Sequence, residues 1–380
     1  MSLRLILFLS LWGAGTLLQA QPVELNTGGA SVEVAGHLWA SPLQSHFASP
    51  EVALAAYRGG GFQKLPAFLG RGFQKDAVWL AFDVPAAQGE WKFLVAQVGP
   101  AYLDFVSAWQ ADAAGHLRSL GRAGDQVPLA QVDIPALKPS FAVKLTSGAS
   151  STVLLRIETT SARVAIVKLY RATRFPSAQA TESLLLGLES AAFLMMGLVA
   201  LGMFWVLRER IYLLWLAVIL TSAGQAFMST GMGYFTLQWN DLYNVNKLTN
   251  GLTLVTIVVS TLFANMLFDF KSLHRWLHRF IIGLSVIILV FTGVGIALTL
   301  TKVAPVFLLA SILMMMILSI GIVVQMVRRH PASLRYGPMY LFTFLIGAVT
   351  MIAVGGSWLP FSELTASAWQ VANLCNLLSL

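Results

Sequence analysis

The second half of the chain is a succession of apolar segments, each close to the length that crosses a lipid bilayer. The hydrocarbon core of a bilayer is about 30 Å thick, and a helix needs about 20 apolar residues to span it. The first six segments meet that length, and the last one stops at the final residue. In chain order the segments are 183–207, 211–233, 248–268, 280–300, 304–327, 338–358 and 364–380. This pattern predicts an α-helical transmembrane bundle of seven spans.

The charges between these segments predict how the bundle is oriented. If the residues before the first span lie outside, the inner loops hold eight Lys or Arg residues and the outer loops hold two, Lys247 and Lys302. Positive loop charge collects on the cytoplasmic side of membrane proteins. The chain is therefore predicted to be a multi-pass membrane protein whose N-terminal half lies outside. The inner basic residues are Arg208, Arg210, Lys271, Arg275, Arg279, Arg328, Arg329 and Arg335.

The N-terminal half is predicted to be exported. Residues 1–20 have the pattern of a secretory signal peptide, in which Arg4 precedes an apolar run that ends at the small residue Ala20. An uncleaved anchor helix is the alternative, and it exports the following residues equally well. Residues 21–175 are then an exported domain, and residues 176–182 are a linker to the first span.

Residues 78–170 alternate in polarity with a period of two, which is typical of half-buried strands. Short strands separated by Gly-, Asp- and Ser-rich turns predict an antiparallel β-sandwich. Strand by strand, the residues expected on one apolar face are Val78, Leu80, Phe82 and Val84; Trp91, Phe93 and Val95; Leu103, Phe105 and Trp109; Phe141, Val143 and Leu145; Val153, Leu155 and Ile157; and Val164, Ile166 and Tyr170.

The sequence offers no catalytic constellation, no metal site and no cofactor site. The exported histidines, among them His116, have no evident acidic partner in sequence, and Cys375 is the one cysteine, which excludes an intramolecular disulfide and a cysteine-based zinc site. Nucleic acid is not an expected partner. The pI near 9.7 comes largely from basic residues in short loops, and membrane topology already explains their positive charge.

Few polar side chains lie within the spans. Glu189 is an intramembrane ionisable residue and hence a functional candidate, although its carboxylate can instead reach the outer headgroups. The run from His274 to Arg279 is predicted to anchor the inner edge of the bundle to anionic lipid. The amides expected to form hydrogen bonds between helices are Gln225, Asn265, Gln325, Asn373 and Asn376.

Six stretches of the chain carry a resemblance to a known family. They are GFQKDAVWLAFDV (72–84), VGPAYLDFVSAW (98–109), AGDQVP (123–128), LLRIETTSA (154–162), GLESAAFLMMGLVALGMFWVLRERIYLLWLAVIL (187–220) and LFANMLFDFKSLHRWLHR (262–279). In these stretches and in its layout the chain resembles the bacterial seven-transmembrane receptors with diverse intracellular signalling modules, in the form that carries the second type of extracellular domain. The family's Gly-Asp-x-x-Pro turn stands here as Gly124, Asp125 and Pro128, but the arginine that usually follows is replaced by the run LAQVD.

The resemblance implies a location in a bacterial inner membrane, with residues 21–175 as a periplasmic sensor domain. It also implies that this outer domain is jelly-roll-like and binds carbohydrate, and that a cytoplasmic output module follows, which in the family is a cyclase, a histidine kinase or a phosphatase. No output motif is present in these residues, so the chain is expected to be the sensor and transmission part and not itself an enzyme. The expected partners are the lipid bilayer, a carbohydrate-like or envelope-derived ligand and an output module or partner in the cytoplasm, and a homodimer stays open. The alternatives are the N-terminal part of a membrane diguanylate cyclase or sensor histidine kinase, and a scaffold that docks an envelope protein.

A sugar site needs an aromatic platform beside planar polar groups. Trp79 projects from the face opposite Leu80 and Phe82, which makes it a candidate platform. Each of these side chains has a structural alternative, core packing for the tryptophan and turn formation for Asp125. The candidate ligand contacts are Trp79, Tyr102, Asp104, Asp125, Arg156 and Arg163.

Overall fold

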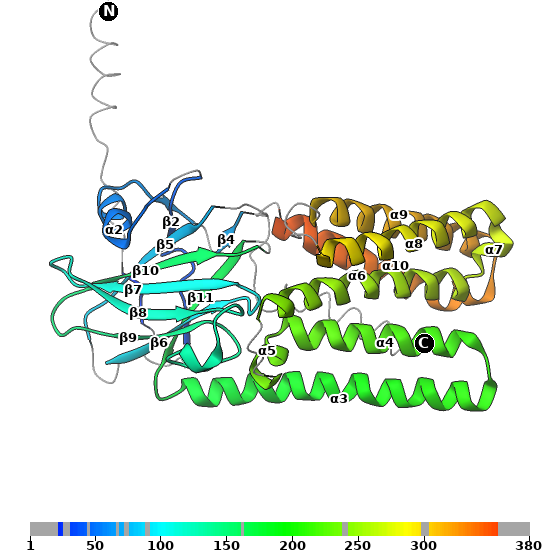
Figure 1. The fold of residues 1–380 in the computed structure, drawn as a ribbon, viewed down its shortest axis with the longest axis horizontal. Coiled ribbons are helices and arrows are strands. Elements are labelled where there is room, and N and C mark those ends of the chain that lie inside the picture. Colours follow the sequence, from blue (N-terminus) through cyan, green and yellow to red (C-terminus); the bar gives the residue numbers. More distant parts are fainter. Residues whose placement is uncertain are drawn as a thin grey trace, which may run out of the picture.

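The computed structural model describes residues 22–25, 31–43, 46–65, 68–71, 76–87, 92–160, 163–237, 242–297 and 304–355. These residues form an N-terminal part built of β-sheets and a C-terminal part of long helices that extend away from it (Figure 1). The predicted signal peptide (1–20) and the predicted seventh span (364–380) lie outside the described residues.

The N-terminal part is a sandwich of two antiparallel sheets. Sheet A has the strand order β1-β11-β6-β9, with β4 also paired to β11, and sheet B has the order β3-β2-β5-β10-β7-β8. The strands are β1 Ser31–Glu33, β2 Trp39–Ala40, β3 Gln63–Lys64, β4 Leu69–Gly70, β5 Val78–Val84, β6 Phe93–Gly99, β7 Phe105–Ala111, β8 Leu117–Ala123, β9 Ser140–Lys144, β10 Ser151–Glu158 and β11 Val164–Arg171. The predicted antiparallel sandwich is confirmed.

The main core lies between the two sheets, and three strands enter it as predicted. On β5, β9 and β10 every second side chain is buried in one cluster, because successive side chains of a strand point to opposite faces. These residues are Val78, Leu80, Phe82, Val84, Phe141, Val143, Val153, Leu155 and Ile157.

The predicted phase was wrong on three other strands. Leu94, Ala96 and Val98 of β6, Val106 and Ala108 of β7, and Ala165, Val167 and Leu169 of β11 face the main core instead. The second face of each of these strands also carries apolar side chains, because part of that face is covered as well. Val95 and Tyr170 pack on Phe175 at the start of the first long helix, and Trp109 packs in a cluster on the outer face of sheet B.

That outer cluster lies beneath helix α2, Pro50–Arg58. The helix begins where the Ser49 hydroxyl accepts a hydrogen bond from the Val52 amide, followed by proline at the first helical position. Its buried side chains Ala53, Leu54 and Tyr57 cover part of sheet B. The outer face of sheet B is thus divided into a part covered by α2 and an open part.

The C-terminal part consists of helices that run roughly parallel to one another (Figure 1). Two of them, α3 and α4, are long and apolar enough to cross a membrane, and the described stretches Gly251–Leu267 and Leu313–Val327 are apolar but shorter. The helices are α3 Phe175–Leu207, α4 Arg210–Ser229, α5 Met232–Leu237, α6 Leu242–Leu267, α7 Phe270–Leu273, α8 Arg275–Ala297, α9 Ala304–Val327 and α10 Pro331–Gly355.

Two predicted boundaries need correction. Residues 176–182 are not a separate linker but the first turns of α3, which runs unbroken for 33 residues. The second predicted span does not reach residue 233, because α4 ends at Ser229 and Gly231 takes a φ of +86° that reverses the chain into α5.

The helical part has one end against the sandwich, here called the proximal end, and an opposite distal end. The α4–α5 turn lies at the proximal end, whereas the α3–α4 turn, α7 and the α9–α10 turn lie together at the distal end (Figure 1). The three loops in which the sequence concentrates positive charge therefore lie at one end, as a common membrane side requires.

Candidate functional site

The structure does not bring the six predicted ligand residues into one site. Trp79 and Arg156 are neighbours on the outer face of sheet B. The loop just before β7 carries Tyr102 and Asp104, and the loop just after β8 carries Asp125. Arg163 immediately precedes β11, near the strand β4 that pairs with β11. Three separate places therefore have to be considered.

Trp79 belongs to the second core. Its side chain is only 2% exposed, it lies 5.4 Å from Trp109 between ring centroids, and it shares the cluster beneath α2 with Tyr57. The Arg156 guanidinium lies 6.0 Å from the Trp79 ring centroid, within the range of a cation–π contact. Trp79 is thus a core residue beneath α2, and its ring is not available as a platform for a ligand.

The open part of sheet B carries a chain of polar side chains from three adjacent strands. Arg156 binds Glu158 at 2.8 Å, and Arg122 of β8 reaches the same carboxylate at 3.7 Å. The Arg122 guanidinium also lies 4.0 Å from the centroid of the Phe105 ring. We call Phe105, Arg122, Arg156 and Glu158 the open-face group. Planar donors, a carboxylate acceptor and an aromatic ring on one accessible surface suit a ligand with several hydroxyl or acidic groups.

Arg163 has a different environment. It is 1% exposed, and its carbonyl accepts a hydrogen bond from the Arg71 amide at 2.9 Å. Burial lowers the pKa of the Arg163 guanidinium, while the charge of Asp76 opposes that change. Arg163 therefore lies within the packing between β4 and β11, away from the open-face group.

The Gly-Asp-x-x-Pro turn folds back onto the loop before β7. The amide of Asp125 donates to the Leu103 carbonyl at 2.9 Å, and the amide of Gln126 donates to the Asp104 carbonyl at 3.1 Å. Gly124 has a φ of +142°, and a Cβ at this position would clash with the backbone of Asp104. Only glycine fits such a position, because it combines a positive φ with a direct backbone approach.

Asp104 is buried and accepts hydrogen bonds from the loop that follows β10. The Thr160 amide and hydroxyl donate to its carboxylate at 2.8 and 2.7 Å, and the Thr159 hydroxyl donates at 3.3 Å. Burial raises the pKa of Asp104, and these hydrogen bonds partly offset that rise. The carboxylate ties the start of β7 to the end of β10.

Asp125 is the less satisfied of the two acids. It is 7% exposed, and its Oδ1 has no hydrogen-bond partner among the residues that the structure describes. Burial, and secondly the charge of Asp104, raises the pKa of the Asp125 carboxyl to about 8. The two acids are thus brought together by the fold, at the side of the sandwich that meets the helices.

The sandwich and the helical part meet at a set of contacts that we call the junction. The Tyr234 hydroxyl of α5 donates to the Val127 carbonyl at 2.6 Å, and Lys138 forms an ion pair with Glu182 of α3 at 2.6 Å. Gly231 lies so close to Leu137 that a Cβ there would overlap the Leu137 carbonyl. The turn that carries Asp125 is therefore packed directly against the helices.

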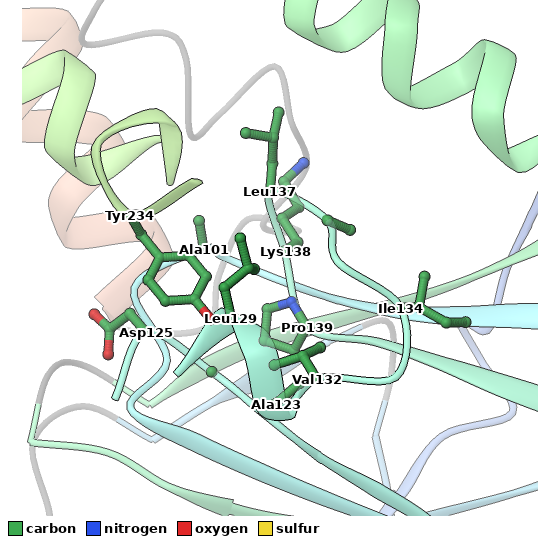
Figure 2. A pocket seen from close by; sticks show the side chains of 12 residues that line it. Ala101, Ala123, Asp125, Leu129, Val132, Ile134, Leu137, Lys138, Pro139 and Tyr234 are labelled. Atoms are coloured by element: carbon green, nitrogen blue, oxygen red, sulfur yellow. The ribbon is translucent and has the colours of Figure 1, made fainter. Parts of the chain in front are cut away.

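A small pocket opens within the junction (Figure 2). Its volume is about 10 Å³, which holds no more than about one water molecule. Asp125 and Lys138 lie on opposite sides of it, with Tyr234 above Asp125 (Figure 2). The pocket therefore has no room for a sugar ring, and the residues of the junction serve here as contacts between the sandwich and the helices.

The distal end is held by hydrogen bonds between helices. The Gln325 amide of α9 donates to the carbonyls of Phe268 and Asp269, each at 2.9 Å, where α6 ends. Asn265 of α6 and His278 of α8 lie 3.0 Å apart between Nδ2 and Nδ1. The prediction that Asn265 and Gln325 bond between helices is confirmed.

Other predicted residues have plainer surroundings. Glu189 is partly exposed on α3, about four turns from the start of the helix. His116 does have an acidic partner, since Asp112 four residues earlier binds its Nδ1 at 3.0 Å in an exposed turn, contrary to our expectation. Within the described ranges, no three His, Cys, Asp or Glu side chains are grouped to hold a metal ion.

Sequence reasoning missed most of the junction. Gly231 and Tyr234 were assigned to the end of a span and the loop after it, Lys138 to the sensor domain and Glu182 to the linker. A glycine beside an apolar run is a signal of chain reversal, and it could have located the turn at Gly231. The Lys138–Glu182 ion pair had no such signal, because only the tertiary fold brings its two segments together.

The structure thus joins a β-sandwich to a set of long helices, two of which are apolar enough to cross a membrane. A family model described as seven-transmembrane, diverse intracellular signalling matches residues 182–380, and one described as the second extracellular domain of the same receptors matches residues 48–171. The chain belongs to this family of seven-transmembrane receptors with diverse intracellular signalling. No curated protein matches the chain significantly.

Proposed function

We propose that the chain is the sensor and transmission part of a bacterial inner-membrane receptor, with the sandwich in the periplasm and seven helical spans. The observation that carries the proposal is the junction. It joins the sandwich to α3 and α5 by the Lys138–Glu182 ion pair and the Tyr234–Val127 hydrogen bond, so a shift of the sandwich also moves helices. The collection of the basic loops at the distal end supports a cytoplasmic location for that end.

Within this proposal, the ligand is carbohydrate-like and binds the open-face group. Arg122 and Arg156 supply planar donors, Glu158 supplies acceptors, and Phe105 supplies a ring face. Ligand binding shifts the receptor between two arrangements of the junction that differ in affinity for the ligand. The output is produced by a cytoplasmic module or partner that responds to the distal ends of the helices.

Selective labelling tests the orientation. In a Cys375→Ser background, Asp112→Cys places a thiol in an exposed turn of the sandwich, and Lys271→Cys places one on α7. A membrane-impermeant maleimide is expected to label the first variant in intact spheroplasts and the second only after lysis. Labelling of the α7 thiol in intact spheroplasts would overturn the proposed orientation.

Glycan binding tests the ligand. The full chain in lipid nanodiscs, with an environment-sensitive dye on Lys271→Cys, is titrated with a panel of glycans. Arg122→Ala is expected to weaken binding of a positive glycan at least about tenfold, the loss of one charge-assisted contact, whereas Arg118→Ala on the same strand leaves it unchanged. A glycan that binds without changing the dye signal would favour the scaffold alternative, and binding of an envelope protein but of no glycan would reject the carbohydrate.

A further inference from the structure

One buried side chain at the junction is not accounted for by packing or by a ligand. Asp125 is one of the residues that line the junction pocket, and the Tyr234 ring lies above it (Figure 2). Its buried Oδ1 has no hydrogen-bond partner among the described residues. A carboxylate at such a place is expensive, because an ion removed from water needs an opposite charge or several hydrogen bonds. A neutral carboxyl avoids this cost.

The charged and titratable groups around Asp125 do not supply an opposite charge. On the loop before β7 stands Asp104, whose own carboxylate is held by Thr159 and Thr160. On α5 stands the phenol of Tyr234, whose hydroxyl is directed to the Val127 carbonyl.

The cation in the same pocket is engaged elsewhere. Lys138 lines the side opposite Asp125, and its ammonium forms an ion pair with Glu182 of α3 at 2.6 Å. Gln126 is the neighbouring group that favours the ionised form through a hydrogen bond. Among the described residues, Asp125 therefore meets one acid, one phenol and one amide, and no ion pair joins it to a base.

We propose that Asp125 is a proton-binding site that controls the junction: its neutral carboxyl allows the sandwich to close on α5, and release of its proton to the solvent loosens that contact. The second acid strengthens the effect, because two adjacent buried carboxyls do not readily ionise together. The receptor then takes protons on the sandwich side as an input, either alone or together with a ligand on the open-face group.

The direction of the effect follows from linkage. The pKa of Asp125 in the closed junction is about 8, above its ordinary value of 3.8. The closed state is therefore favoured most at low pH, and the advantage declines as pH rises from the ordinary value to the raised one. Over that window the opening equilibrium constant of the junction is expected to rise by up to about tenfold per pH unit.

Hydrogen exchange on the full chain in nanodiscs tests the proposal. Exchange is measured between pH 5 and 9 and corrected for the intrinsic pH dependence of amide exchange. Peptides from 124–139 and 226–237 report the junction, and peptides around α7 serve as the internal reference. The wild-type junction is expected to lose protection steeply with pH, whereas the reference does not.

Three variants complete the test. Asp125→Asn is similar in shape and cannot ionise, so its junction is expected to stay protected at high pH. Asp125→Ala removes the same titration with a different side chain, and Asp112→Asn is the control, because it removes an exposed acid of the same domain. An Asp125→Asn profile that matches the wild type would overturn the proposal.

A measurement on the unaltered chain guards against a variant that misfolds. Infrared spectroscopy is expected to show the C=O stretch of a protonated carboxylic acid at pH 7 that is lost above pH 9, and its absence would equally overturn the inference. The physiological meaning rests on the proposed receptor function, but the outcomes separate. A glycan that moves the dye on α7 while junction exchange is independent of pH would retain the receptor and reject the proton site.

Discussion

The proximal and distal ends of the helical part are both sites where a turn is pressed against a neighbouring element, but they are held in different ways. At the distal end, Gly321 of α9 packs so closely on the Phe270 ring that a Cβ would lie 2.7 Å from the nearest ring atom. At the proximal end, Gly231 packs on the backbone of Leu137 in the same close manner. Close glycine contacts are therefore common to the two ends.

The hydrogen bonds differ between the ends. In the turn between α6 and α7 at the distal end, the carbonyls of Phe268 and Asp269 accept hydrogen bonds from Gln325. At the proximal end, the Oδ1 of Asp125 has no hydrogen-bond partner within the part of the chain that the structure describes. A fully satisfied buried network makes one arrangement rigid, and a buried acid that lacks a partner makes an arrangement conditional on its environment. We therefore expect the turn between α6 and α7 to keep one arrangement and the proximal junction to change.

Gly124→Ala is expected to have the largest effect on the unfolding free energy, and it alters only the proximal side. The new Cβ would overlap the Asp104 backbone and also meet an unfavourable φ, so a loss of about 3 kcal/mol or more in unfolding free energy is expected. Thermal unfolding of the full chain in detergent measures it. Gly148→Ala, at a positive φ in open space, is the control and should cost about 1 kcal/mol.

Gly231→Ala sharpens the comparison at the junction itself. Because the added methyl pushes against Leu137 and also meets a positive φ, we expect the junction to separate at a cost of about 2 kcal/mol, while each domain stays folded. Hydrogen exchange should rise in residues 124–139 and not in the sandwich core. Gly202→Ala on α3, where nothing lies within 4 Å, should leave exchange unchanged. Loss of protection throughout β5 and β10 would contradict a local effect.

Gln325→Leu makes the distal end resemble the proximal one. Two buried carbonyls at the end of α6 lose their donor, which is expected to cost about 2 kcal/mol and to increase labelling of a thiol at position 271. Exchange at the junction should not change. If Gln325→Leu changes neither the stability nor the labelling at position 271, the difference between the two ends does not hold.

Tyr234→Phe is the mildest change, since it removes one hydroxyl from the junction and keeps the ring. The lost hydrogen bond to the Val127 carbonyl is expected to weaken the closed junction by about 1 kcal/mol, or about fivefold in its opening constant. Exchange in residues 124–139 should show this, with α7 unaffected. An equal change at both ends would mean that the two turns are more strongly coupled than their separate hydrogen bonds suggest.

The pattern of the sequence was sufficient for the architecture but not for every strand. On β5 and β10 polar residues such as Asp83 and Arg156 mark the outer face, and the predicted phase was right. On β6 and β11 the second face also carries apolar side chains, Val95 and Tyr170, where the start of α3 covers it, and alternation then carries less information. The long helices could be predicted because a run of about 20 apolar residues is typical of a membrane-spanning helix and of few other structures.

The site was less predictable for a related reason. The Gly124–Asp125 turn was recognisable as a motif, yet its surroundings come from Asp104, twenty positions earlier, and from Tyr234 on α5. The role of Trp79 was equally undetermined, because a tryptophan on the outer face of a sheet is a platform if it is open and a core residue if a helix covers it. Only the position of α2 decides between these.

The unbroken course of α3 fixes the direction in which the sandwich faces. A helix of 33 residues is about 50 Å long, about 20 Å more than the hydrocarbon core of a bilayer, and its first turns lie beside the sandwich, where Glu182 pairs with Lys138. The sandwich is thus joined to the helical part by a stiff post and not by a flexible tether, so its open face keeps one direction around the helix axis. Each residue added to the post would turn that face by about 100° around the helix axis.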